Sequence, residues 1–142
     1  MGFFAAIANG YRNYFGFSGR ASRSEFWFFY LYNFLAVIGL IVIAGLFSLH
    51  GGPPVRRAMP IPSIVGLVLA GLLLVANALP MLALAVRRIH DTGQSGWWVL
   101  TMFIPQLGAL AMIGWGCAPG TDGDNVHGPS PLALSRAGGS AA

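Results

Sequence analysis

Three long uncharged runs dominate the pattern of hydrophobic and polar positions along the chain. They cover residues 26–49, 61–86 and 97–117. At ~1.5 Å per residue, a helix over even the shortest run reaches ~30 Å, the thickness of the hydrocarbon core of a bilayer. We therefore expect an all-α membrane protein with three transmembrane helices, in a single membrane domain over residues 1–131.

The two ends of the chain show different patterns. Among residues 1–18, aromatic and aliphatic positions recur every three or four residues, while Asn9, Arg12 and Asn13 fall on the opposite side. This arrangement predicts an amphipathic helix over residues 1–18 that lies in the membrane interface. Residues 132–142 are rich in Ala, Gly and Ser, and we expect them to form a disordered tail.

Local signals predict where the first two long helices begin and end. Ser22 and Glu25 have the spacing of a capping box, which would start a helix near Arg23. Gly93 is a natural residue just beyond a helix C-terminus, so the second helix should continue to about Asp91. Both helices are thus expected to reach beyond their uncharged runs.

The composition excludes an ordinary soluble domain. Charged residues make up 8% of the 142-residue chain and hydrophobic residues 56%, whereas a soluble domain carries roughly 25% charged residues. The net charge of +4 comes from arginines that mostly flank the apolar runs, which favours membrane anchoring over nucleic-acid binding. We therefore expect the lipid bilayer as a partner and no nucleic acid. A single cysteine also excludes an intrachain disulfide.

Three full spans would place residues 20–25 and 87–98 on the same side of the membrane. That side would carry five arginines and the opposite side three, which predicts a cytoplasmic N-terminus and an external C-terminus. The alternative is a re-entrant third run, interrupted at Pro105 and Gly108. It would return the sequence DGDN at 122–125 to the side of the arginines.

All seven candidate functional residues lie in the segments 20–25 and 87–98. The seven residues, which we call the charged cluster, are Arg20, Arg23, Glu25, Arg87, Arg88, His90 and Asp91. A structural role is one interpretation, because cations in a last helical turn interact favourably with the helix dipole and Asp91 is within reach of Arg87 or Arg88. Anion binding is a second, since the arginine fork matches phosphate geometry. Acid–base chemistry by His90 with Asp91 is a third.

The sequence predicts no metal site and no cofactor. The three histidines are scattered over different segments, and no Ser or Cys lies at a spacing typical of a catalytic triad. The sequence DGDN resembles the start of a calcium loop, but it lacks the downstream Glu that completes an EF-hand. A turn built by Asp, Gly and Asn is the simpler interpretation.

Three separated motifs together resemble a known family. They are GRASRSEFWFFYLYNFL, RRIHDTGQSGWWVL and PGTDGDNVHGPSP, and in this order they resemble the domain-of-unknown-function 805 family over residues 10–131. His127 stands where the family pattern has Tyr. The resemblance implies a small multi-pass protein of the bacterial inner (plasma) membrane, and it implies no activity.

We therefore expect a small polytopic inner-membrane protein that is not an enzyme and acts as a scaffold or subunit, with a second copy or another membrane protein as partner. The alternative is a lipid-handling or transport component that binds an anionic headgroup through the four arginines of the charged cluster. A membrane-embedded enzyme is a third hypothesis. The scaffold hypothesis predicts that Arg87 and Arg88 tolerate exchange for Lys, whereas headgroup binding would lose the bidentate fork.

Overall fold

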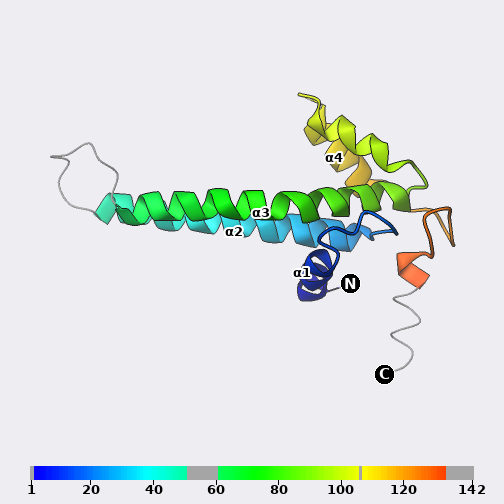
Figure 1. Ribbon diagram of the computed structural model, residues 1–142, viewed down its shortest axis with the longest axis horizontal. Coiled ribbons are helices and arrows are strands. Elements are labelled where there is room, and N and C mark those ends of the chain that lie inside the picture. Colours follow the sequence, from blue (N-terminus) through cyan, green and yellow to red (C-terminus); the bar gives the residue numbers. More distant parts are fainter. Residues whose placement is uncertain (1, 51–60, 106, 134–142) are drawn as a thin grey trace, which may run out of the picture. The chain divides into compact units, whose positions relative to one another are not determined.

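The computed structural model describes residues 2–50, 61–105 and 107–133, and these residues form helices, turns and one isolated bridge without any strand. The helices are α1 (Phe3–Arg12), α2 (Arg23–His50), α3 (Ile61–Asp91), the 3₁₀ helix η1 (Gly96–Phe103) and α4 (Gly108–Cys117), as Figure 1 shows. The expected all-α fold is confirmed for the described residues. Two compact units divide the chain: Leu31–Ala78 forms one, and Met1–Tyr30 with Leu79–Ala142 forms the other.

The unit Leu31–Ala78 is a pair of helical segments joined at small side chains. The Ser63 hydroxyl donates to the carbonyl oxygen of Ala44 at 2.8 Å and lies 2.8 Å from the hydroxyl of Ser48. A Cβ added to Gly66 would lie 2.8 Å from the Cβ of Ala44. Small residues let the helix backbones approach closely, as at helix contacts within membranes.

Two described helices, α2 and α3, are long and apolar enough to cross a membrane. Their most apolar 18-residue windows have mean hydropathies of 2.2 and 2.4, yet only 11% and 28% of those windows are buried within the molecule. A core helix of a soluble protein would be mostly buried, so this exposed apolar surface is typical of helices that face lipid. Both helices also have the expected ends, and Gly93 follows α3 with a φ of 77°.

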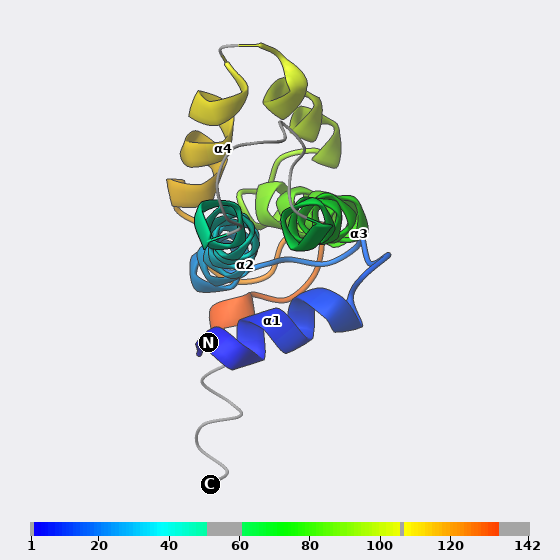
Figure 2. The same ribbon diagram turned by 90° about the vertical axis from the view of Figure 1, so that its left-hand side faces the viewer.

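The expected third spanning helix over residues 97–117 is not confirmed, because the described residues of this run form no continuous helix. The run forms η1 and α4 with a break between them, because Pro105 has no N–H to continue the helix and Ile104 before it is extended, with φ −76° and ψ 121°. Each helix is about 15 Å long, half the length needed to span. The two pack against each other, with the rings of Trp98 and Trp115 6.1 Å apart, and Figure 2 shows them side by side. We call them the η1–α4 hairpin.

Helix α1 is shorter than the predicted 1–18. It ends at Arg12, and the Asn13 side chain donates to the carbonyl oxygen of Asn9 at 2.9 Å. Figures 1 and 2 show α1 lying crosswise to the start of α2. Ring contacts join Phe3 to Phe28 and Tyr11 to Phe29, with centroids 5.9 and 5.6 Å apart, so one face of α1 packs on α2.

Turns follow α4, and residues 131–133 form a helical turn. The expected disordered tail therefore begins with two ordered residues, 132 and 133. Its remaining part, residues 134–142, lies outside the described residues.

Candidate functional site

Asp91, the last residue of α3, accepts hydrogen bonds from two arginines. Its Oδ1 lies 2.9 Å from Nε of Arg20, and its Oδ2 pairs with Nη1 of Arg88 one turn earlier on α3. All three side chains are buried, at 1%, 0% and 7% exposure for Arg20, Arg88 and Asp91. Buried arginines need a carboxylate or several carbonyl acceptors to offset their desolvation, and Asp91 supplies both oxygens.

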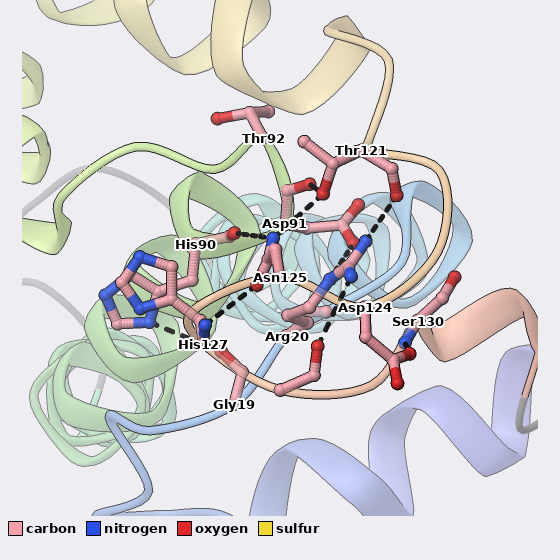
Figure 3. Close-up of polar contacts among 12 residues, drawn as sticks. Gly19, Arg20, His90, Asp91, Thr92, Thr121, Asp124, Asn125, His127 and Ser130 are labelled. Carbon is pink, nitrogen blue, oxygen red and sulfur yellow. Dashed lines mark hydrogen bonds and ion pairs between the residues drawn. The ribbon is translucent and has the colours of Figure 1, made fainter.

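The rest of the Arg20 guanidinium holds the loop that follows α4. Nη2 donates to the carbonyl oxygen of Thr121 at 2.7 Å, and Nη1 to that of Gly123 at 2.6 Å (Figure 3). The backbone N–H of Thr121 in turn donates to the carbonyl oxygen of Asp91 at 2.7 Å. Arg20 lies between α1 and α2, so it fastens the turn after α4 to the end of α3.

Arg88 holds the returning end of the η1–α4 hairpin. Its Nε donates to the carbonyl oxygen of Trp115 at 3.1 Å, and its Nη2 donates to that of Ala118. These are carbonyls of the last turn of α4 and its cap, which lack partners inside the helix. A further bond, from Nη1 to the carbonyl oxygen of Ala21 at 3.2 Å, reaches the segment before α2.

A third ion pair, between Arg87 and Glu25, joins α3 to α2. Nη1 of Arg87 lies 3.2 Å from Oε1 of Glu25, and that oxygen also accepts from Asn9 Nδ2 of α1 at 2.8 Å. The predicted capping box is half present, because the N–H of Glu25 donates to Ser22 Oγ at 3.2 Å while the Glu25 carboxylate serves the ion pair instead. Nε and Nη2 of Arg87 are buried without a hydrogen-bond partner among the described residues.

His90 belongs to a third set of contacts. Its Nδ1 lies 3.3 Å from the carbonyl oxygen of Gly19, and since a carbonyl only accepts, Nδ1 carries the proton. Its ring stacks on that of His127, with centroids 3.9 Å apart and planes 6° apart (Figure 3). Asn125 fixes this arrangement: its Nδ2 donates to the carbonyl oxygen of His90 at 3.0 Å, and its Oδ1 accepts from the N–H of His127 at 2.8 Å.

The structure therefore distributes the charged cluster over three connected sets of contacts. Arg23 joins the first set through a shared acceptor: its Nε donates, in an exposed position, to the carbonyl oxygen of Ala118 at 3.0 Å, and the same oxygen accepts from Nη2 of Arg88. The sequence predicts a turn at 122–125. The backbone bends at Asp122 and Gly123, and the hydrogen-bonded turn lies further along, where Asn125 and Gly128 exchange backbone hydrogen bonds at 3.0 and 3.1 Å. No group of three or more metal-binding side chains occurs among the residues that the structure describes.

Sequence reasoning brought the segment DGDN to the side of the arginines only in the re-entrant alternative, and it named none of the partners that the cluster contacts. Thr121, Asn125 and His127 lie in the third family motif, and that motif was the available signal. The carbonyl groups of Ala21 and Trp115 carry no signal, because every residue has a carbonyl group.

The chain is similar to known proteins of the bacterial inner membrane. Inner membrane protein YhaI of Escherichia coli (strain K12) is 42% identical over 123 residues, which cover 84% of this chain and 89% of that protein. Inner membrane protein YhaH of the same strain is 38% identical over 122 residues, covering 84% and 90%. No solved structure matches the chain. With its long apolar helices, the chain is thus a bacterial inner-membrane protein of unknown activity.

A further relative, the uncharacterized protein YiiR of the same strain, is 31% identical over 106 residues, covering 75% of this chain and 60% of that protein. The family model described as "Protein of unknown function (DUF805)" matches residues 14–129. The match includes the first two motifs, the third as far as Pro129, and every residue of the charged cluster. The chain belongs to the DUF805 family of proteins of unknown function.

Proposed function

We propose that the chain is a non-enzymatic scaffold or subunit of the bacterial inner membrane. The charged cluster and the turn after α4 form its polar end, which the chain's own hydrogen bonds hold together; we call this polar end the platform. The observation that carries this proposal is the sharing of Asp91 by two buried arginines. Arg20 and Arg88 direct their hydrogen bonds to the chain itself, and together they join the ends of α3 and α4. A polar network satisfied in this way rigidifies a fold, so it supports a platform more than a ligand site.

The contacts of Asp91 support the non-enzymatic part of the proposal. A His–Asp pair in acid–base catalysis needs the carboxylate to accept from the imidazole, which orients the ring. Both oxygens of Asp91 accept from arginines instead, and Nδ1 of His90 donates to the carbonyl oxygen of Gly19. Asp91 is therefore not the partner that would orient His90 as a base.

We also infer a two-span topology with both termini in the cytoplasm. Arg88 binds carbonyl groups both before α2 and at the end of α4, which supports a hairpin that enters and leaves on one side. In this topology that side carries six of the eight arginines, namely Arg12, the four of the charged cluster and Arg136, against Arg56 and Arg57, which come between α2 and α3 in the sequence. By the positive-inside rule, this difference favours a cytoplasmic platform.

The η1–α4 hairpin is the surface on which we expect a partner to bind. Trp97, Phe103 and Leu110 are 79%, 69% and 67% exposed. Large aromatic and aliphatic side chains of this kind anchor protein interfaces. The partner is a second copy of this chain or another inner-membrane protein.

Photo-crosslinking in intact cells tests the scaffold proposal. A photoreactive amino acid replaces Leu110, and a matched control replaces Val99, which is 8% exposed on η1. We expect one discrete protein adduct from position 110 and none from position 99. An adduct of twice the chain's own mass identifies a second copy, and any other single mass identifies a membrane-protein partner. If position 110 and the exposed positions 97 and 103 yield lipid adducts alone, the scaffold proposal is wrong.

Binding of an anionic headgroup is a second candidate, favoured by Arg87. Two of its buried nitrogens have no partner among the described residues, and the four arginines of the charged cluster outnumber its two carboxylates. The exchange of Arg88 for Lys cannot distinguish the two functions, because Lys would lose the hydrogen bonds of Arg88 to backbone carbonyl groups whichever function is correct. The exchange Arg87→Lys does distinguish them. If the chain binds a headgroup, the variant should co-purify with less anionic lipid while its thermal stability is unchanged. If the chain is a scaffold, the amount of co-purified lipid should not change. Arg12→Lys is the control.

A further inference from the structure

An apolar groove lies beside the charged cluster, within the unit that contains both chain termini. It has a volume of about 950 Å³ and runs between the last turns of α3, η1 and the turn carrying His127. Leu82 and Val86 of α3 form one wall, and Val99 and Leu100 of η1 form the other. A volume of this size is typical of small-molecule sites, which bury most of an apolar ligand.

The groove is polar at one end and apolar at the other. Among the lining residues, His90 and Ser95 lie at the end of α3 and just before η1, and His127 stacks on His90, whereas Leu82 lies two turns earlier on α3 and Phe103 is the last residue of η1. From Leu82 to His90 the helix rises ~12 Å, at ~1.5 Å per residue. One leaflet of a hydrocarbon core is ~15 Å thick, so the apolar wall has about the length that an acyl chain occupies.

Two groups at the polar end are available to a ligand. Ser95 caps η1 without a side-chain hydrogen bond. The ring nitrogens of His127 have no hydrogen-bond partner among the described residues, although its ring stacks on His90. A hydroxyl and an imidazole N–H are donors suited to phosphate oxygens.

The groove is also continuous with the surface that meets the bilayer. Leu82 and Val86 belong to α3, a helix long and apolar enough to span. Trp97, Leu100 and Phe103 also line the groove, and all three side chains are at least half exposed. An apolar groove that opens toward lipid is filled by hydrocarbon in preference to water, since water there would lack polar partners.

We propose that this groove binds one acyl chain of a bilayer phospholipid, with the glycerol-phosphate end at His127 and Ser95. The occupant is a structural lipid that wedges the η1–α4 hairpin against α3. This site is distinct from Arg87, which lies outside the groove.

The test uses the full chain in vesicles of phosphatidylethanolamine that contains a diazirine in one acyl chain. After photolysis, mass spectrometry maps the labelled residues. We expect label to concentrate on Leu82, Val86 and Leu100 relative to Ile113, which is 49% exposed on α4 outside the groove. Equal labelling of the groove and Ile113 in the wild-type chain would indicate annular lipid alone and would overturn the proposal.

Variants sharpen the mapping. Leu100→Trp fills the groove and should lower its labelling several-fold, while the matched control Ile113→Trp should leave it unchanged. Leu82→Trp, from the opposite wall, replaces Leu100→Trp if that variant does not fold. Unchanged groove labelling in a folded wall variant contradicts the proposal, and the wild-type map decides the question without any variant.

The polar end is tested separately with His127→Phe, which keeps a ring against His90 but removes the ring N–H. We expect lower groove labelling by the phospholipid. Labelling by diacylglycerol with the same diazirine chain should not change, because diacylglycerol lacks the phosphate. Equal labelling of the wild type and His127→Phe by the phospholipid would exclude the proposed headgroup position.

Discussion

Arg20 donates from Nε to Oδ1 of Asp91 at 2.9 Å, although 71 positions separate the two residues in the chain. The contact fastens the segment before α2 to the end of α3. Asp91 also pairs with Arg88, and its backbone carbonyl accepts from the N–H of Thr121 at 2.7 Å. One residue therefore joins the start of the first long helix, the end of the second and the turn after α4.

Asp91→Asn should destabilise the protein strongly. The substitution keeps the shape of the side chain but leaves Arg20 and Arg88 buried without a carboxylate. Removing one partner of a buried ion pair costs about 3–5 kcal/mol. We expect a loss of this order in the free energy of unfolding in detergent, followed by tryptophan fluorescence.

Asp122→Asn is the matched control for this measurement. Asp122 is an exposed carboxylate near the same segment, and its exchange should leave the free energy of unfolding nearly unchanged. Equal stabilities of the Asp91 and Asp122 variants would show that the shared carboxylate does not hold the platform together.

Gly120→Ala should also destabilise the platform, by a steric route. A Cβ at this position would lie 2.2 Å from Oδ2 of Asp91, and the two arginines prevent that carboxylate from moving aside. At Gly114 on α4, by contrast, a Cβ would meet nothing within 4 Å. We expect a lower midpoint of thermal unfolding for Gly120→Ala, and an unchanged or higher one for Gly114→Ala because Ala favours helix. Equal midpoints would contradict the close approach.

His127→Tyr should preserve the stack on His90, whereas His127→Ala should lose it. The resembled family pattern has Tyr at this position, and an aromatic ring can occupy the same place over the imidazole. An aromatic pair contributes about 0.5–1.5 kcal/mol beyond the area it buries. We expect His127→Ala to unfold earlier by about that free energy and to exchange amide hydrogens faster over residues 121–128. If His127→Tyr is as unstable as His127→Ala, ring stacking does not account for the role of position 127.

The C-terminus should lie on the same side of the membrane as the N-terminus. A reporter active only in the cytoplasm and one active only outside are fused, in separate strains, after Ala142. We expect cytoplasmic activity for the C-terminal fusion, because the η1–α4 hairpin returns to Arg88. External activity would restore the three-span topology and would mean that the contacts of Arg20 with residues 121–123 do not form in the membrane.

The sequence by itself determined the two long helices and their ends. Length and hydropathy suffice for this, because an uncharged run of 24 or more residues has few stable alternatives to a lipid-facing helix. Local chemistry was equally informative at Gly93, where the positive φ that ends α3 favours glycine. Pro105 also indicated a break in the third apolar run. Hydropathy alone nevertheless favoured a third span, so the interrupted run, which the structure contains as the η1–α4 hairpin, was only the alternative prediction.

The tertiary structure alone decided how the charges are paired. The sequence allowed Asp91 to reach Arg87 or Arg88, and the fold gives it Arg88 and Arg20 while Arg87 turns to Glu25. Composition cannot decide this, because the pairing depends on which helix ends meet in space. It also depends on backbone carbonyls at Ala21, Trp115 and Thr121, and a carbonyl becomes a specific acceptor for an arginine only where the fold buries the two together.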